Sequence, residues 1–377
     1  MDKSIGEIKN DTLAIIGASF GQEKLFIKAK ELGLRTIAFA WTHGAICKDM
    51  ADVFYPISIT ETEQIVDICK KENVKGIVSN CSDVTAAEVS KLTTFLGLHG
   101  IPYSSFLSIR NKYAMRKLLN GIEELSQVWS YQYAGEKPQS YPCVVKPCIG
   151  ASKIGVCFVH NDEQFDEAIK YAKDATSGNI LVEQFIEGHE VSVESISFEG
   201  RHYVVQITDK DCTGEPHFVE TGHHQPSSLS QKIQDKIIRI TSRILDKINF
   251  QNGASHTEMK ITSNGDVYII EVNPRGGGDE ISNTLVSLST DYDYVKAMIT
   301  VAIGSFTAPV VHNVSHAGIY YLCKQTKDYV EFFKNADGKP WLVKKEVSSY
   351  ELREGTSNYD RNGYLIYKDI KKIEINE

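Results

Sequence analysis

The sequence of 377 residues lacks several signals that would assign it to a common class of protein. Its eight cysteines include no Cys-x-x-Cys pair, which argues against zinc and dithiol motifs and favours reduced thiols. No apolar run approaches the roughly 18 residues of a membrane span, and no charged-then-apolar leader stands at the start. The net charge of −8 argues against a surface for nucleic acid. The sequence therefore predicts a soluble cytoplasmic protein, with neither a nucleic-acid nor a membrane partner.

Two nucleotide-binding loops are also missing in their usual form. The first turn, residues 17–21, contains glycine but does not follow G-x-G-x-x-G, so we interpret it as a tight strand-to-helix turn. The loop after Lys146 lacks the G-x-x-x-x-G-K-[ST] spacing of a Walker loop. Its small residues would still let backbone N–H groups approach a phosphate, although such a loop is more often a plain turn.

What is present is an ordinary globular composition, 42% hydrophobic and 24% charged, with a pattern that changes along the chain. Residues 1–110 alternate short apolar runs with amphipathic stretches, which predicts a parallel sheet with crossover helices. From about Pro142 the pattern becomes pairs of strands with a few helices, which predicts an α+β domain. After about Ser305 further short strands predict a small C-terminal cap.

The most informative segment is an expected hairpin at residues 256–273. Asn264-Gly265 is the preferred pair for a two-residue type I′ turn, and this turn would place Glu258 opposite Glu271. Asn273 would share the face of Glu271, and the other face would carry Tyr268, Ile270 and Val272. Opposed carboxylates repel, and Mg²⁺ or Mn²⁺ would remove this penalty because it prefers carboxylate and amide oxygens. Taken alone, these residues fit an exposed hairpin with a stray acid pair better.

Two further segments have functional and structural readings. Residues 181–194 predict a strand, a short polar link and a second strand. An adenine is recognised by backbone groups of an apolar linker, and a carboxylate placed like Glu190 accepts both ribose hydroxyls. In isolation, two strands with acidic outer faces explain this segment better. Lys112 and Arg116, one turn apart on an expected helix, are in isolation solvated charges.

Taken in order, these pieces resemble the ATP-grasp superfamily, and within it the carboxylate–amine ligases similar to bacterial L-amino-acid ligases. The resemblance covers nearly the whole chain and is weakest after about residue 310. It is carried by Lys112 and its neighbours to 116, Lys146 and its loop, residues 183–190, Glu258, and the run Glu271-Val272-Asn273-Pro274-Arg275. It implies a mixed α/β and α+β fold, with an N-terminal parallel α/β (pre-ATP-grasp) domain at 1–110 and an ATP-grasp domain at 111–309. That domain would have lobes at about 111–183 and 184–309, and a C-terminal subdomain would follow at 310–377.

The resemblance also implies roles for residues in a cleft between the lobes. The residues implied to bind ATP are Lys112, Lys146, Ser152, Lys153, Glu183, Gln184, Phe185, Ile186 and Glu190. Those implied to hold Mg²⁺ (or Mn²⁺) are Glu258, Glu271 and Asn273. The implied substrate contacts are Glu220, His223, Arg275, Gly277, Gly278 and Asp279, and the implied catalytic residues are Arg275 and Lys146. Asn80 and Asp83, at the carboxyl end of an expected parallel strand, would border the same cleft.

The implied reaction activates a small carboxylate, an amino acid in the ligases resembled, as an acyl phosphate and joins it to an amine, releasing ADP and phosphate. Two alternatives stay open: a carboxylase or carbamate-phosphorylating enzyme of the same fold, and a non-catalytic ATP-binding protein. The chain has no biotin-type Met-Lys-Met segment, and it retains Arg275 with the three metal-ligand candidates. The expected partners are a small carboxylate and an amine, and a homodimer is the default for a soluble enzyme.

Overall fold

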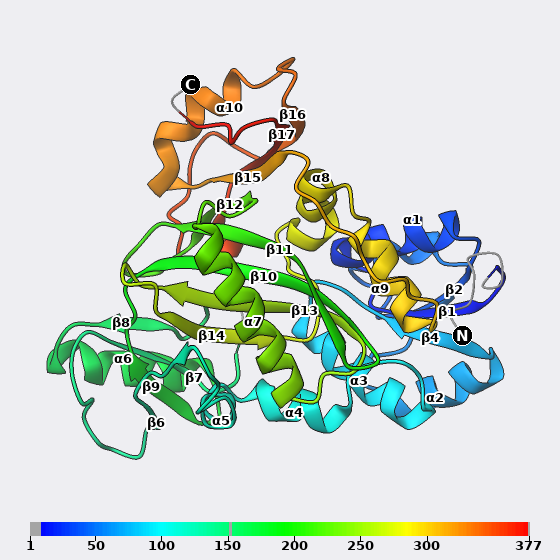
Figure 1. Ribbon diagram of the computed structural model, residues 1–377, viewed down its shortest axis with the longest axis horizontal. Helices are drawn as coiled ribbons and strands as arrows, with labels where there is room; N and C mark the ends of the chain where they lie inside the picture. The colour runs from blue at the N-terminus through cyan, green and yellow to red at the C-terminus, as the bar shows by residue number, and fades with distance from the viewer. Residues whose placement is uncertain (1–8, 151–152, 376–377) are drawn as a thin grey trace.

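A parallel α/β domain opens the computed structural model, which describes residues 9–150 and 153–375 (Figure 1). Its four-stranded sheet has the order β3-β2-β1-β4 and consists of β1 (Thr12–Ile16), β2 (Arg35–Phe39), β3 (Val53–Tyr55) and β4 (Val74–Val78). The crossover helices are α1 (Glu23–Glu31), α2 (Thr62–Lys71) and α3 (Asp83–Leu96). All five residues of β1 are buried, because helices cover both faces of a parallel sheet. The predicted N-terminal architecture is thus confirmed.

A second sheet of four strands, which we call lobe A, follows two connecting helices, α4 (Tyr103–Arg110) and α5 (Lys112–Leu118). Its order is β6-β9-β7-β8, with β6 (Ser130–Gln132), β7 (Cys143–Pro147), β8 (Cys157–Val159) and β9 (Ile180–Gln184). Helix α6 (Asp162–Ala175) packs Phe165 and Ile169 against this sheet, and Asn161 caps its first turn. The strand β9 and the following strand β10 belong to different sheets, so the link between them joins lobe A to the rest of the molecule.

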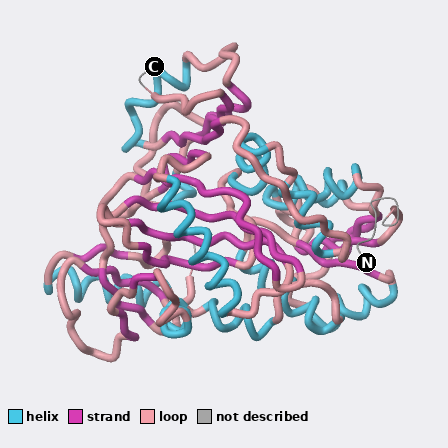
Figure 2. The backbone as a smooth tube through the Cα atoms, in the orientation of Figure 1, coloured by secondary structure: helices cyan, strands magenta, loops and turns pink. Residues whose placement is uncertain are grey.

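The largest sheet has nine strands in the order β16-β17-β15-β12-β11-β10-β13-β14-β5. They are β5 (Leu125–Ser126), β10 (His189–Phe198), β11 (Arg201–Cys212), β12 (Glu220–Gln225), β13 (Gly253–Ile261), β14 (Val267–Asn273), β15 (His316–Leu322), β16 (Leu342–Val347) and β17 (Gly363–Asp369). Figure 2 shows that the strands of this sheet continue side by side into the C-terminal part of the chain, where β15 pairs with β12. The C-terminal segment therefore extends the central sheet and forms no sheet of its own within residues 9–150 and 153–375.

Four more helices belong to this part of the chain: α7 (Gln231–Lys247), α8 (Val286–Thr290), α9 (Tyr294–Ala302) and α10 (Val330–Lys334). Helix α7 lies across one face of the central sheet (Figure 1), where Ile237, Ile240 and Ile244 join the core with Val193 and Ile207 of the strands. These isoleucines recur at helical spacing, which is why α7 was predictable from the sequence. Among the described helices, none is both long and apolar enough to cross a membrane.

The β13–β14 hairpin differs from its prediction at the turn. Thr262 pairs with Asp266, donating its N–H to that carbonyl at 3.0 Å, so the loop has three residues. Gly265 closes it at φ 81°, a left-handed conformation that glycine adopts without strain. The predicted two-residue turn is therefore wrong, and Met259 lies opposite Ile269, one position out of the predicted register.

A bulge corrects this shift further along the same ladder. The register changes between Met259 and Glu258, after which Glu258 lies opposite Glu271 as predicted and His256 lies opposite Asn273. The bulge also changes which side chains of β14 face the core. The prediction that Tyr268 and Ile270 share a face with Val272 is wrong, because Val272 is buried with Val267 and Ile269.

Candidate functional site

A cavity of about 690 Å³ lies where the N-terminal domain, lobe A, the central sheet and the C-terminal segment meet. Its volume is typical of a site for a nucleotide or another small molecule. The predicted site residues that line it are Lys112, Lys146, Lys153, Glu183, Gln184, Phe185, Ile186, Glu190, Glu220, His223, Glu258, Glu271, Asn273, Arg275, Gly278 and Asp279. Gly277 lies behind the wall, and Ser152 lies outside the described residues. The structure thus brings together residues that span most of the chain.

The expected nucleotide end is organised by a buried carboxylate, Glu183 of β9. It lies 2.5 Å from Lys146 Nζ and 3.0 Å from Arg116 Nε. Burial raises the pKa of Glu183, but these two cations lower it further, to about 2, so the group is an anion. Its side chain is therefore committed to the cations, which leaves the backbone of residues 184–186 as the route to an adenine.

Arg116 corrects one expectation. It is buried, and its guanidinium also donates to the carbonyl of Ile270 at 2.9 Å, so the prediction that it is a solvated charge is wrong. Neighbouring Lys112 donates to the carbonyl of Gly150 at 2.9 Å, which ties helix α5 to the glycine loop of lobe A. Lys112 and Arg116 therefore face the cavity, whereas the third cation of the helix, Lys117, is exposed to solvent.

The opposed acids of the hairpin are each held by a lysine. Lys112 Nζ lies 2.9 Å from Glu271, and Lys210 Nζ lies 2.7 Å from Glu258. Burial raises the pKa of Glu258, but Lys210 and His256 together lower it more, so this group is also an anion. Like charges that face each other across the ladder are thus offset by cations on two other elements. Asn273 is buried on the same wall of the cavity, and the three oxygen-bearing side chains offer the donors that Mg²⁺ prefers.

Lys210 was missed by the sequence analysis, yet it is the central cation of the site. Its side chain is 3% exposed and lies 3.3 Å from Glu190 and 3.0 Å from Glu220, in addition to Glu258. The available signal was a lysine inside a strand, within Asp209-Lys210-Asp211, but alternation alone also fits an exposed edge. The three partners come from β10, β12 and β13, so only the folded sheet shows that they share one cation.

A second buried charge group lies behind the expected metal ligands. Glu194 accepts a hydrogen bond from His256 Nδ1, and His256 Nε2 lies 3.2 Å from Glu258. Burial lowers the pKa of His256, but Glu194 raises it to about 9, so the ring is an imidazolium at neutral pH. Glu194 also accepts the N–H of Gly277 at 3.0 Å, and a Cβ on Gly277 would lie 2.7 Å from this carboxylate. Gly277 therefore packs against the charge group and is absent from the cavity lining, and its contact with substrate stays a prediction.

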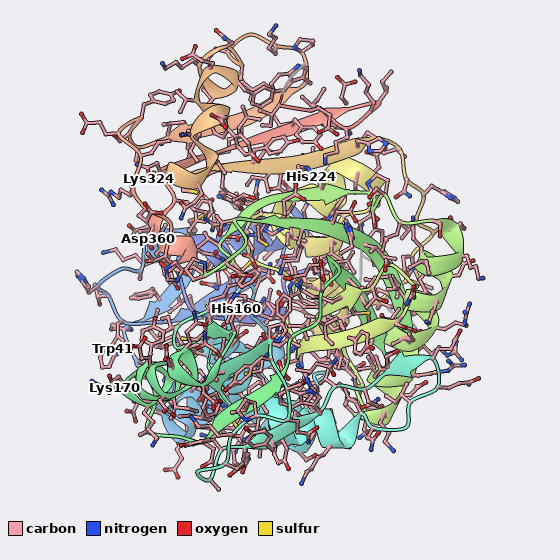
Figure 3. All side chains as sticks on the ribbon, turned by 90° about the vertical axis from the view of Figure 1, so that its left-hand side faces the viewer. Trp41, His160, Lys170, His224, Lys324 and Asp360 are labelled. Atoms are coloured by element: carbon pink, nitrogen blue, oxygen red, sulfur yellow. The ribbon has the colours of Figure 1, made fainter. Side chains whose placement is uncertain are left out.

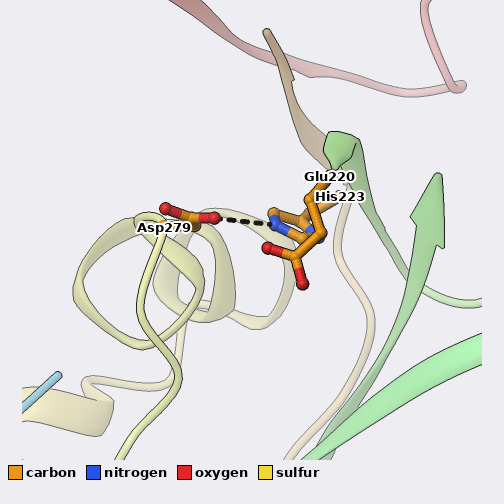
Figure 4. A group of neighbouring side chains, drawn as sticks. All are labelled: Glu220, His223 and Asp279. Atoms are coloured by element: carbon orange, nitrogen blue, oxygen red, sulfur yellow. Dashed lines mark hydrogen bonds and ion pairs between the residues drawn. The ribbon is translucent and has the colours of Figure 1, made fainter. Parts of the chain in front are cut away.

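At the expected substrate end, Glu220, His223 and Asp279 point toward one another (Figure 4). Each could offer a metal-ligand atom within 4.8 Å of the others, and His223 Nε2 lies 3.5 Å from Asp279. Asp279, however, accepts two hydrogen bonds from Arg361, at 2.7 and 2.9 Å. Glu220 is likewise paired with Lys210. Protein cations therefore already neutralise both acids, and the substrate contact of Asp279 stays a prediction.

Arg275 is held at the junction with the N-terminal domain. Its Nε donates to Asp83 at the start of α3, and its Nη1 donates to the carbonyl of Gly276 at 3.1 Å. Asp83 lines the cavity, while Asn80 lies behind it and donates to Ser282 at 2.9 Å. The carboxyl end of the parallel sheet thus borders the site.

Comparison with known proteins adds to this geometry. Residues 139–284 match the model of the ATP-grasp domain. The chain is 26% identical over 273 residues to an alanine–anticapsin ligase of Bacillus subtilis (strain 168), which covers 61% of this chain and 57% of the ligase. The crystal structure of an L-amino acid ligase from Bacillus licheniformis superposes with a TM-score of 0.79 at 22% identity, covering 96% of this chain and 94% of that one. An N5-carboxyaminoimidazole synthetase of Staphylococcus aureus complexed with ADP gives 0.76 at 15% identity, covering 98% and 95%.

Proposed function

We propose, from the premise that this chain has the ATP-grasp fold, that the protein is an ATP-dependent ligase that joins a small carboxylate to an amine and releases ADP and phosphate. The observation that carries the proposal is the pair Glu258 and Glu271, opposed across one ladder and each held by a lysine on the wall of the same cavity. The names of the alanine–anticapsin ligase and the L-amino acid ligase support an amino acid as the carboxylate. The chain spans 57% of the length of the alanine–anticapsin ligase, so its substrates are part of the proposal.

Glu258, Glu271 and Asn273 would hold Mg²⁺, and Lys112, Lys146, Lys153 and Lys210 would face the phosphates of ATP. Magnesium, when bound, would neutralise charge on the transferred phosphoryl group. The ion pairs of the site support this assignment. If Lys112 moved from Glu271 to a phosphate oxygen and Glu271 bound the metal instead, each charge would keep an opposite partner. No buried ion would then be left unpaired.

Arg275 would stabilise the charge that develops on the transferred phosphate and on the acyl oxygen, and Asp83 would orient its guanidinium. In the first step a carboxylate oxygen attacks the γ-phosphorus and the bond to the bridging oxygen of ADP breaks. In the second step the amine nitrogen attacks the acyl carbon, phosphate leaves, and the nitrogen loses a proton. Glu220 and His223 lie beside the place where these groups would meet.

The proposal is tested by a pairwise panel of amino acids and amines, read by phosphate release and product mass. ADP should form only when the right carboxylate is present, and hydroxylamine should trap the activated acid as a hydroxamate. Glu271→Gln should abolish this turnover, whereas Glu354→Gln, which removes an exposed acid paired with Lys324, should not. Failure of every carboxylate to provoke ADP release would refute the ligase, and ADP release driven by bicarbonate alone would favour the carboxylase alternative.

The expected setting follows from the same proposal. Each of the eight cysteines is a free thiol, which fits a reducing compartment, so we place the protein in the cytoplasm. Its partners would be a small carboxylate and an amine, with a homodimer as the default assembly.

A further inference from the structure

The C-terminal part of the chain reaches into the cavity at one short turn, Asn358–Asp360, and the arginine that follows it. Asp360 stiffens this turn by accepting hydrogen bonds from Thr356 and Ser357, at 2.7 to 3.1 Å. In the view of Figure 3, Asp360 faces the reader between Lys324 of the C-terminal segment and His160 of lobe A. The turn is thus a hydrogen-bonded element at the entrance to the cavity.

Two side chains of this turn hold the acids of the substrate end. Asn358 Nδ2 donates to Glu220 at 2.6 Å, and Asn358 Oδ1 accepts the backbone N–H of Glu220 at 3.3 Å. Arg361 donates hydrogen bonds to Asp279 from both terminal nitrogens, and its guanidinium lies 3.7 Å from the centroid of the ring of Tyr321. Burial lowers the pKa of Arg361 but Asp279 raises it more, so the pair is fully ionised. A planar arginine that is bonded and stacked in this way holds its partner in one geometry.

The acids at this end are consequently paired with protein cations, and three exposed large apolar side chains also line the cavity. Tyr359, between the two holding residues, is 78% exposed and lines the cavity. Val84 and Phe20, from two segments of the N-terminal domain, line it as well and are 62% and 46% exposed. Exposed large apolar side chains gathered at one cavity mark a surface that a ligand covers. An apolar substrate side chain would remove this area from water, whereas a charged one would find no unpaired opposite charge among the contacts described above.

We propose that residues 358–361 are the specificity element of the substrate site: Asn358 and Arg361 position Glu220 and Asp279, and Tyr359 provides an aromatic wall for an apolar side chain of the amino-acid substrate. This inference rests on the proposed ligase function, and it assigns a role to the C-terminal segment, for which the sequence predicted only structure. Tyr359 discriminates between side chains, while Asn358 and Arg361 are positioning residues.

The test is the binding of L-phenylalanine and of L-alanine to the full chain in the presence of magnesium and ADP, measured by calorimetry. Wild type should bind phenylalanine at least about tenfold more tightly than alanine, because each buried methylene in an apolar pocket is worth about tenfold or more. Tyr359→Ala should remove most of this ratio, and Tyr359→Phe should keep it. Tyr350→Ala is the matched control, since Tyr350 is an exposed tyrosine of the same segment and is absent from the lining of this cavity. Arg361→Lys should weaken the binding of both amino acids alike without weakening the binding of ADP.

The inference is overturned where Tyr359→Ala keeps the wild-type ratio, where Tyr350→Ala lowers it equally, or where neither amino acid binds. A selective binding ratio without ADP release in the panel of carboxylates would refute the ligase and leave the specificity element standing. Turnover of carboxylates together with a phenylalanine-to-alanine binding ratio that Tyr359→Ala leaves unchanged would refute the specificity element and leave the ligase standing.

Discussion

Replacing Lys210 with methionine isolates the largest electrostatic contribution in the cavity. Methionine keeps the length and the apolar stem of the side chain but removes the charge shared by Glu190, Glu220 and Glu258. Breaking a buried ion pair costs about 3–5 kcal/mol, because the remaining charge stays in a poorly solvated place. The three acids lose this cation, but each keeps a second cation 3.2 to 3.9 Å away and can take up a proton, so we expect one such loss and not three. That loss is a large share of the roughly 5–15 kcal/mol by which folded domains are stable.

The free energy of unfolding of Lys210→Met should therefore be about 3–5 kcal/mol below wild type in urea titrations at pH 7 with a chelator present. The difference should shrink as the pH falls. In wild type the folded pKa values of Glu220 and Glu258 are depressed, so their contribution is present above the ordinary value of 4.5 and is lost below it. In the variant these acids take up protons at a higher pH than in wild type. Lowering the pH therefore reduces the free energy of unfolding of the variant by a smaller amount. Magnesium should restore part of the loss, because it offers the acids another cation.

The surface pair of Lys137 and Asp166, 2.9 Å apart, gives a matched control. Lys137→Met also removes a lysine from a carboxylate, but both side chains are exposed, so the transition should hardly move. A loss of less than about 1 kcal/mol for Lys210→Met at pH 7, or an equal loss at pH 7 and pH 4, would refute the reasoning, because either result would mean that the acids carry no buried charge.

Three further predictions follow from single groups. Arg275→Lys should lower kcat by about 10²–10³ with little change in KM for ATP, measured by ADP release, because it removes donors to the developing charge. Burial raises the pKa of Asp209, but hydrogen bonds from His189 and Ser227 lower it further, to about 2, against an ordinary value of 3.8. Wild type should therefore lose about 2 kcal/mol of stability from this group between pH 4 and pH 2, followed by circular dichroism, and Asp209→Asn should lack this loss. Glu258→Gln should weaken Mn²⁺ binding at least about tenfold, measured by paramagnetic resonance of the free ion.

The hairpin shows what local sequence rules can and cannot predict. The existence of both strands and the opposition of Glu258 and Glu271 were predicted from alternation and one Asn-Gly pair, and the structure confirms them. The turn length was wrong, and the register at the acids is right because a bulge beyond the turn restores it. Turn propensity distinguishes loops whose free energies differ by only a fraction of the stability of the sheet. The bulge is decided instead by the packing of Val267, Ile269 and Val272 in the core.

The site shows a different limit. Helix α7 could be predicted because its apolar period lies within one segment, but the partners of Lys210 lie on three strands that no local pattern relates. The contact of Arg361 with Asp279 joins residues 82 positions apart. Such pairs are products of the tertiary fold, so a motif can identify the acids without identifying the cations that hold them. From the sequence, Asp279 was accordingly predicted as a substrate contact, whereas Arg361, the cation that holds it, was not identified.

The two ends of the cavity are built from different parts of the molecule, and this division has a functional consequence. The proposed nucleotide end joins α5 to β14 through Lys112 with Glu271 and Arg116 with Ile270. The same helix is joined to lobe A through Arg116 with Glu183. The substrate end is made by the central sheet together with a turn of the C-terminal segment. Because β15 and β17 continue that sheet, a change in the turn alters the substrate wall without moving the strand that carries the metal-ligand candidates. Under the proposed function, substrate preference would therefore vary through the C-terminal segment while the binding of ATP stays constant. Binding measurements on Tyr359 variants with and without nucleotide would detect this difference.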